Sequence, residues 1–241
     1  MARQRHNDLE IYDRHGRGWW DEHDRTFASL RSVAGFRRGV LESWLPRGVA
    51  GLRVVDLGCG GGLWAVPLAE SGANVVGVDR SLESLRTALQ RASHRCRFVR
   101  ADLNDPPLAD GCADLVVLAD VIEHLDDPQI AVYQAARLLV PGGLLYVSTL
   151  NRTRRAGVLA VALAEGLGLI PRGTHDPKRF VRPEALDDMA GRCGLRRQNL
   201  QGEALAWWPT LRRWAVVLRR GRSSAVSYAA LFRKPEEPCG G

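Results

Sequence analysis

The sequence has almost no lysine, since Lys178 and Lys234 are the only two among its 34 basic residues. So strong a preference for arginine is more typical of codon composition than of selection at individual positions. The net charge of +7 therefore does not by itself indicate a nucleic-acid or anionic-membrane partner. We expect most of the arginines to lie on a solvated surface.

Cysteine is scarce, and its spacing excludes two classes of site. The five cysteines form no Cys-x-x-Cys pair and no zinc-ligand spacing, so we expect free thiols rather than a disulfide framework.

Long apolar runs are also absent, because the longest, residues 157–170, contains Glu165 and is too short to span a bilayer. Since the first residues lack the apolar core of a secretory signal, we expect a cytoplasmic protein.

Strand and helix patterns alternate along the middle of the chain. Unbroken apolar runs predict strands, and the segments between them have the spacing of helices. This order is typical of an α/β domain with a parallel sheet and helices on both faces. We expect one domain over residues 1–241. Its parts are a helical cap (1–50), a core (51–150), a lid or insertion (152–182), and a C-terminal helix and strand pair (183–234). The strands of the core are expected at 52–57, 74–78, 97–100, 114–118 and 144–149.

The glycine-rich run VVDLGCGGG, residues 54–62, joins the first strand to a helix. Glycines at such a turn let a ligand approach the backbone, and the helix N-terminus offers unpaired N–H groups. The dinucleotide fingerprint G-x-G-x-x-G fails here because its third glycine would fall on a leucine, and the glycines stand instead at Gly58, Gly60 and Gly62. Asp56 would repel a pyrophosphate but attract the positive charges of a sulfonium amino acid, which favours S-adenosylmethionine as the cofactor.

Acidic residues follow the second and third strands. Asp79 ends the second strand, where it can accept hydrogen bonds from ribose hydroxyls, although NAD enzymes place an acid there too. Asp102 follows the third strand and is a candidate acceptor for an adenine amino group, and the alternative is that it only closes its loop. Their neighbours Arg80 and Leu103 are expected to line the same cofactor site.

Six stretches of the sequence carry a resemblance to a known family. The glycine run and the later Pro-Gly-Gly turn resemble the class I methyltransferases, and the full set is similar to the ubiquinone-biosynthesis O-methyltransferases, the UbiG family, over residues 19–190. The stretches are WWD (19–21), VVDLGCGGG (54–62), IEHLDDP (122–128), LLVPGG (138–143), STLNR (148–152) and LIPRGTHDPKRFVRPEAL (169–186).

The resemblance implies a Rossmann-like fold with a seven-stranded, mostly parallel sheet. It also implies an S-adenosylmethionine-dependent O-methyltransferase that acts on a phenol or catechol hydroxyl of a quinone precursor. Implied cofactor contacts are Arg37, Gly58, Asp79 and Ala119. The substrate pocket is expected to include Asn151, Thr174 and His175. For His175, a structural role in its loop is an equal alternative.

Asp120, Glu123 and His124 follow the fourth strand and would share one face of a helical turn. In one mechanism, His124 is a general base that a carboxylate orients. In the other, all three residues hold Mg²⁺ or another divalent cation that binds and acidifies a catechol. The resemblance implies this metal-dependent reaction, although the family carries Glu where this chain has Asp120. A further interpretation is that Glu123 and His124 only close the loop.

Two apolar segments with flanking arginines are compatible either with contact to a membrane or with packing on the protein core. Residues 157–170 have the composition either of an interfacial helix on an anionic bilayer, at the inner membrane face, or of a lid helix on the core. Residues 204–220 again combine apolar and basic side chains, here with three tryptophans, and no resemblance extends past about residue 195.

The alternative functions are a specialised-metabolite methyltransferase acting on a non-prenylated hydroxyl or amine, and a basic protein that binds or methylates RNA. The sequence contains no RNA-binding motif.

Overall fold

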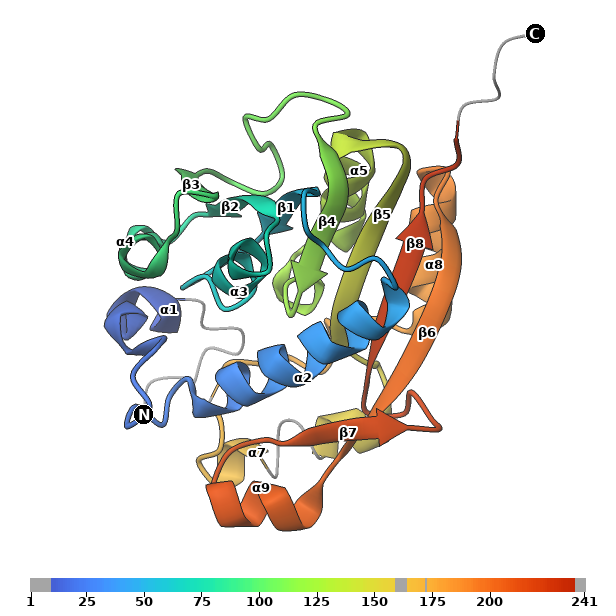
Figure 1. Ribbon diagram of the computed structural model, residues 1–241. Coiled ribbons are helices and arrows are strands. Elements are labelled where there is room, and N and C mark those ends of the chain that lie inside the picture. Colours follow the sequence, from blue (N-terminus) through green and yellow to red (C-terminus); the bar gives the residue numbers. More distant parts are fainter. Residues whose placement is uncertain (1–9, 159–163, 172, 237–241) are drawn as a thin grey trace, which may run out of the picture.

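The expected strands form one twisted sheet in the computed structural model, which describes residues 10–158, 164–171 and 173–236 (Figure 1). The strands are β1 (Arg53–Leu57), β2 (Asn74–Asp79), β3 (Cys96–Arg100), β4 (Ala113–Ala119), β5 (Leu139–Leu150), β6 (Arg196–Leu205), β7 (Leu218–Gly221) and β8 (Ser227–Arg233). Their order across the sheet is β3-β2-β1-β4-β5-β8-β6-β7. The first five in this order are parallel, and the last three pair antiparallel with their neighbours.

Across the described residues, the sheet has eight strands rather than the seven expected, because β7 adds a further edge strand. The predicted C-terminal pair corresponds to β6 and β8, which lie side by side. A helix, α9 (Trp207–Arg213), separates β6 from β7 in the sequence. Because the four residues of β7 are LRRG, without alternation of apolar and polar side chains, periodicity does not predict a strand there.

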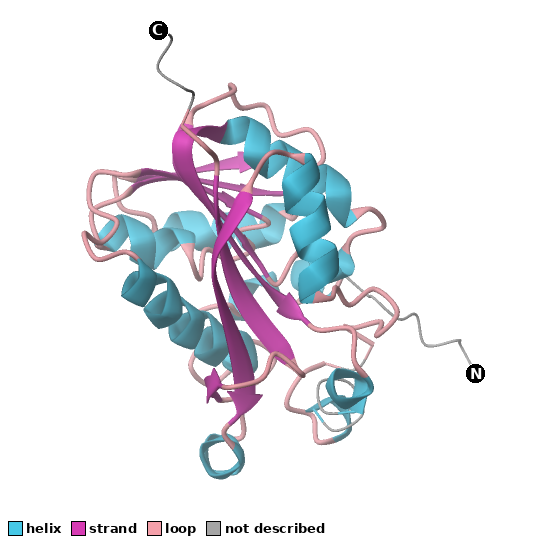
Figure 2. Cartoon of the chain, turned by 90° about the vertical axis from the view of Figure 1, so that its right-hand side faces the viewer, coloured by secondary structure: helices cyan, strands magenta, loops and turns pink. Residues whose placement is uncertain are grey.

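Helices cover both faces of the sheet, as Figure 2 shows. Val54 of β1 belongs to the core that includes α2 (Ala28–Trp44) and α3 (Ala65–Glu70), whereas the next residue, Val55, belongs to the core that includes α5 (Pro128–Leu138) and α8 (Pro183–Arg192). Successive side chains of a strand point to opposite faces, so an unbroken apolar strand supplies both cores. The predicted Rossmann-like architecture is confirmed.

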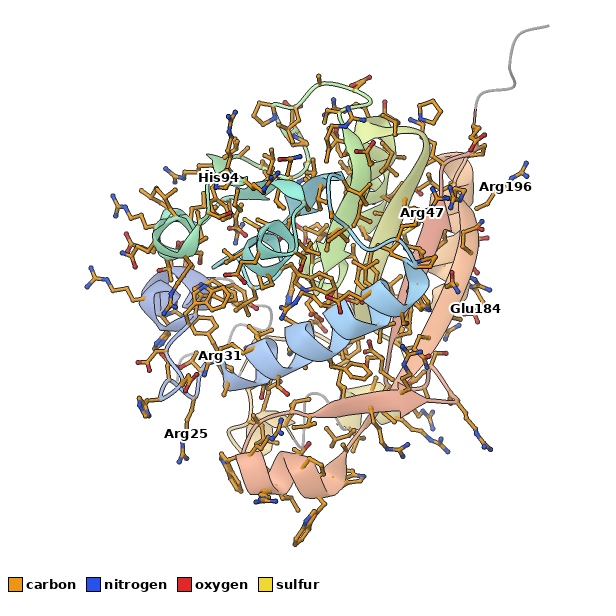
Figure 3. The ribbon with its side chains drawn as sticks, viewed as in Figure 1. Arg25, Arg31, Arg47, His94, Glu184 and Arg196 are labelled. Atoms are coloured by element: carbon orange, nitrogen blue, oxygen red, sulfur yellow. The ribbon has the colours of Figure 1, made fainter. Side chains whose placement is uncertain are left out.

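The arginine-rich surface and the free thiols agree with the composition. Arg25, Arg47 and Arg196 are exposed (Figure 3). The described cysteines are free thiols, and Cys239 lies outside the described residues.

The apolar segment at 157–170 is described only in part, since residues 159–163 lie outside the described residues. Short helices α6 (Arg154–Ala156) and α7 (Ala164–Gly166) precede and follow the gap. The hydroxyl of Ser29 in α2 donates to the carbonyl of Leu169 at 2.5 Å and accepts the N–H of Val216 at 2.9 Å. This hydroxyl therefore joins the segment after α7 and the segment after α9 to the start of α2.

Candidate active site

A cavity of about 820 Å³ opens at the carboxyl ends of β1, β2 and β4. In parallel α/β sheets, ligands bind at this edge because the loops that leave neighbouring strands diverge there. The lining includes Gly58 and Gly60 after β1, Asp79 at the end of β2, and Asp120 and His124 after β4. Residues predicted separately for cofactor binding and for chemistry thus share one cavity.

The glycine loop takes a backbone conformation that side chains would obstruct. Gly58 has φ of 78°, and a Cβ atom there would lie 2.6 Å from Cγ2 of Val121. Gly60 has φ of 49° and lines the cavity with its backbone. Gly62 has φ of 82° but does not line the cavity, because it closes the turn against Ala88. Of the three predicted glycines, two therefore line the cavity and the third has a structural role.

Asp79 is fixed by two backbone hydrogen bonds. Its Oδ2 accepts the N–H of Gly60 at 2.8 Å, and its Oδ1 accepts the N–H of Ser81 at 2.8 Å. Burial raises the pKa of Asp79, and these backbone N–H groups oppose the rise. Each carboxylate oxygen keeps a further lone pair, so Asp79 can accept hydrogen bonds from two neighbouring hydroxyls of a ligand in the cavity.

Asp56 lies behind the glycine loop rather than in the cavity. Asp56 is 2% exposed and does not line the cavity, and its Oδ2 has no hydrogen-bond partner. Burial, followed by the charge of Asp79, raises the pKa of Asp56 to about 7. The predicted attraction between Asp56 and the cofactor therefore has no direct contact to support it.

The chain before α2 forms a roof over the glycine loop, which sequence reasoning did not predict. A Cβ atom on Gly61 would lie 2.1 Å from Cγ of Trp19, so the indole ring covers this glycine. Nε1 of Trp20 donates to the carbonyl of Gly61 at 2.7 Å. Tyr12 lines the cavity, and its ring stacks on Trp19 with centroids 5.6 Å apart. We call Tyr12, Trp19 and Trp20 the aromatic roof.

One face of α4 (Leu82–Arg91), together with its N-cap, holds the roof segment in place. The Ser81 hydroxyl bonds to Oδ1 of Asp13 at 2.5 Å, and Ser84 Oγ accepts Nε1–H of Trp19 at 3.0 Å. The Thr87 hydroxyl donates to the carbonyl of Gly16 at 2.7 Å. Hydroxyl residues at every third position are the one sequence signal that would have revealed this contact, because they share a helix face.

The three residues after β4 do not share one face as predicted. Asp120 has φ of 56°, a left-handed conformation that interrupts any helix. The turn that follows, η2 (Ile122–His124), is a 3-10 turn, in which Glu123 is 1% exposed and does not line the cavity. Burial and then the charge of Asp120 raise the pKa of Glu123 to about 8. Only Asp120 and His124 reach the cavity.

These residues do not fit the predicted cation site. In the part of the chain that the structure describes, no group of three His, Cys, Asp or Glu side chains is arranged to hold a metal ion. Asp120 is already paired with the guanidinium of Arg37, and Glu123 does not line the cavity. We therefore derive no step of the reaction through a cation.

His124 and His175 lie with their ring centroids 5.4 Å apart. Burial, with the neighbouring imidazole next, lowers the pKa of His124 to about 3, and burial lowers the pKa of His175 to about 4. Both rings are therefore uncharged at neutral pH. His124 lines the cavity, whereas His175 does not.

The other predicted substrate residues also stand outside the cavity wall. The side-chain amide of Asn151 donates to the carbonyl of Ser224 at 2.7 Å. The hydroxyl of Thr174 donates to the carbonyl of Pro171 at 2.7 Å. Both residues are buried and stabilise the loops around the cavity, so direct contact between them and a substrate stays a prediction.

Comparison with known proteins assigns the chain to a family. A model described as a methyltransferase domain matches residues 55–147. A ubiquinone biosynthesis O-methyltransferase of Ralstonia nicotianae is 35% identical over 236 residues, which are 96% of this chain and 95% of that protein. The chain belongs to the ubiquinone-biosynthesis O-methyltransferase family. A second relative of that name, from Thiobacillus denitrificans, is 37% identical over 76% of this chain and 80% of its own length.

Solved structures agree with this family at the level of the fold. The magnesium protoporphyrin IX methyltransferase of Synechocystis PCC 6803 with bound S-adenosylhomocysteine has a TM-score of 0.66 at 20% identity, over 94% of this chain and 95% of that one. A possible histamine N-methyltransferase of Thermotoga maritima also has a TM-score of 0.66, at 21% identity over 93% of this chain and 99% of that one. This family member is an S-adenosylmethionine-dependent O-methyltransferase.

The comparison corrects one expectation about the C-terminus. The match to the Ralstonia relative covers 96% of the chain, so the family likeness does not end near residue 195. The expected limit was wrong because the strands at this end lack short motifs that a single sequence can reveal. Within the described ranges, no helix has the length and apolar character needed to cross a bilayer.

The remaining predicted cofactor residues divide into two groups in this methyltransferase. The cavity lining includes Arg80, Asp102, Leu103 and Ala119. Arg37 does not line it, because this side chain is 2% exposed and its guanidinium is bound to two carboxylates. Arg37 is therefore not part of the cavity wall, and its predicted contact with the cofactor stays a prediction.

Proposed function

We propose that this enzyme methylates a hydroxyl on the aromatic ring of a phenolic or catechol quinone precursor. The observation that carries the proposal is that Asp79 and His124 line one cavity, at the ends of β2 and β4. The curated relatives are named for ubiquinone biosynthesis, which supports an aromatic hydroxyl acceptor. Neither the amine nor the RNA alternative has an observation in its favour.

In this proposal the donor lies along the glycine loop. The backbone of Gly58 and Gly60 allows its close approach, and Asp79 accepts hydrogen bonds from its ribose hydroxyls. Asp102, Leu103 and Ala119 form the adenine side, and the aromatic roof excludes water from above. S-adenosylmethionine supplies an electrophilic methyl group on sulfur, so catalysis depends chiefly on aligning the acceptor oxygen with it.

His124 is the group that we propose to receive the acceptor's proton. A phenol with a pKa of about 10 must lose its proton to become a good nucleophile. The imidazole of His124 lines the cavity and is uncharged, which is the form that accepts a hydrogen bond from a hydroxyl. Because its pKa is low, His124 takes the proton only as the methyl group leaves the sulfonium, when the positive charge in the cavity passes from the sulfur to the imidazole.

Replacing His124 with alanine is expected to lower kcat about 100-fold while the Kd for S-adenosylhomocysteine changes less than about twofold. Turnover of a simple catechol and calorimetric titration measure the two quantities. His94→Ala is the matched control, because His94 is exposed and does not line the cavity (Figure 3). An unchanged kcat in the His124 variant would remove this residue from the chemistry.

The first test of the function itself has two parts, which are calorimetric titration of the wild-type chain with S-adenosylhomocysteine, and turnover of catechol with S-adenosylmethionine as the methyl donor and either Mg²⁺ or EDTA present. We expect binding in the micromolar range and methyl transfer to the catechol in both media. Turnover abolished by EDTA and restored by Mg²⁺ would contradict the metal-free proton transfer. Absence of binding and of turnover would contradict the proposed function.

We also propose peripheral contact with anionic lipid, through α9 and the residue that follows it. Trp207, Trp208, Leu211 and Trp214 are 49%, 77%, 48% and 40% exposed, and basic side chains occupy the last turn of the helix. Indole rings beside arginines suit the boundary between headgroups and acyl chains of an anionic bilayer.

Flotation with vesicles of phosphatidylcholine and phosphatidylglycerol tests this contact. We expect the chain to float with anionic vesicles but not with pure phosphatidylcholine, and Trp208→Ala to reduce the bound fraction at least threefold. Tyr133→Ala is the matched control, because Tyr133 is 57% exposed on α5. Equal loss in both variants, or no binding by the wild type, would contradict the proposal.

A further inference from the structure

Arg37 of α2 lies between two carboxylates that come from distant parts of the sequence. Its Nε donates to Oε1 of Glu203 at 2.9 Å, and its Nη2 donates to Oε2 of Glu203 at 2.7 Å. Its Nη1 donates to Oδ1 of Asp120. A fork of two parallel bonds fixes the plane of a guanidinium, so Glu203 determines where the third nitrogen points.

Glu203 is itself held from the C-terminal strands. It belongs to β6, its residue is 1% exposed, and its Oε2 also accepts the hydroxyl of Ser227 in β8 at 2.7 Å. The hydroxyl of Tyr146 in β5 donates to the backbone carbonyl of Arg37 at 3.3 Å. The guanidinium is thus fixed by the antiparallel part of the sheet, which α2 passes in Figure 1.

Only the last member of this chain of contacts reaches the cavity. Asp120 lines it, whereas Arg37 and Glu203 do not. The backbone of Asp120 has φ of 56°, and its N–H donates to the carbonyl of Ser148 at 3.0 Å. The backbone N–H and one carboxylate oxygen of Asp120 are therefore both held by hydrogen bonds.

The position of Asp120 indicates which ligand it faces. It lies in the loop after β4, close in sequence to His124, whereas the acid that we assign to the donor ribose, Asp79, ends β2. A carboxylate held next to the proton acceptor is suited to accept a hydrogen bond from the second hydroxyl of a catechol, the one that does not donate to His124, and so to fix the ring against the donor.

We propose that Glu203 is a positioning residue, which orients Arg37 and through it holds the Asp120 carboxylate against an aromatic hydroxyl acceptor. This rests on the proposed function, because the acceptor is the hydroxyl-bearing ring assigned there. It assigns a part in acceptor orientation to β6, a strand that contributes nothing to the cavity wall.

The test compares Glu203→Gln, Asp120→Asn and the double variant, with kinetics on a simple catechol and calorimetric titration with S-adenosylhomocysteine. Glutamine keeps the size of Glu203 but replaces one acceptor oxygen with a donor, so the fork to Arg37 is lost. We expect kcat/KM for the catechol to fall about 10-fold, while the Kd for S-adenosylhomocysteine changes less than about twofold. In the Asp120→Asn background, Glu203→Gln is expected to have no further effect.

The double variant separates positioning from a general structural role. Equal 10-fold losses in both backgrounds, or unchanged kinetics in Glu203→Gln, would overturn the proposal. Glu184→Gln is the matched control, because Glu184 is an exposed glutamate on α8 (Figure 3). If Glu203→Gln does not fold, Ser227→Ala removes only the hydroxyl bond to Glu203, and it is expected to lower kcat/KM two- to threefold. No effect in that variant would equally count against the proposal.

Failure of the proposed function would look different. In that case the wild-type chain would neither bind S-adenosylhomocysteine nor methylate the catechol. Failure of the positioning role leaves wild-type binding and turnover intact, and it shows only in the absence of coupling between positions 203 and 120.

Discussion

Replacing Asp79 with alanine is expected to weaken binding of S-adenosylhomocysteine at least 100-fold. The variant loses the two carboxylate oxygens that we assign to the ribose, and hydrogen bonds to a charged group contribute about 1.5–3 kcal/mol each. It also frees the N–H groups of Gly60 and Ser81, each of which donates to Asp79 at 2.8 Å, so the glycine loop loses its fixed shape. Calorimetric titration measures the loss directly.

Asp102→Ala is the matched control for this variant. Asp102 is a second acid on the same cavity, but it is exposed, and its Oδ1 accepts the N–H of Asn104 at 2.8 Å. We expect its removal to weaken binding less than about 10-fold. Undiminished affinity in the Asp79 variant would overturn the assignment of the ribose site, whatever Asp102→Ala does.

Replacing Arg37 with leucine is expected to lower the free energy of unfolding by about 3–5 kcal/mol. The substitution leaves Glu203 buried without its guanidinium, and it leaves the Asp120 carboxylate without its cationic partner. A buried charge that loses its only opposite charge is much more costly than an exposed one. Urea unfolding, followed by circular dichroism, measures the change.

Two further variants show whether the unpaired charge is the cause. Arg53→Leu breaks the surface pair with Asp114, where the side chains are 51% and 29% exposed, and we expect a change of about 0–1 kcal/mol. Arg37→Leu combined with Glu203→Leu removes both members of the buried pair, and we expect this double variant to be more stable than Arg37→Leu alone. Equal stability of the two would show that packing, rather than charge, dominates.

The core of the fold was predictable because its signals are local. The unbroken apolar strands, the glycine loop and Asp79 all follow from residues within a few positions of one another, and the structure places them as expected. The serine at position 81 likewise caps α4, since its side chain accepts the N–H of Ser84. Short-range patterns thus predicted the side of the cavity at which we propose that the donor binds.

The acceptor side was less predictable because it depends on one backbone angle and on distant contacts. The shared face assumed for Asp120 and Glu123 requires a helix, but the left-handed residue at 120 turns the chain before η2 begins. The partner of Arg37 lies 166 residues further along the chain, and no periodicity connects α2 with β6. The roof residue Tyr12 was missed for the same reason.

The aromatic roof also limits how far this protein can be shortened. The methyltransferase family model matches residues 55–147, which contain the glycine loop, Asp79 and His124. Truncation to that range would delete Tyr12 and Trp19, and it would expose the edge of β5 that β8 now covers. The matched segment is therefore an incomplete unit, in which the cavity would open to solvent on the side that the first turns of the chain now cover.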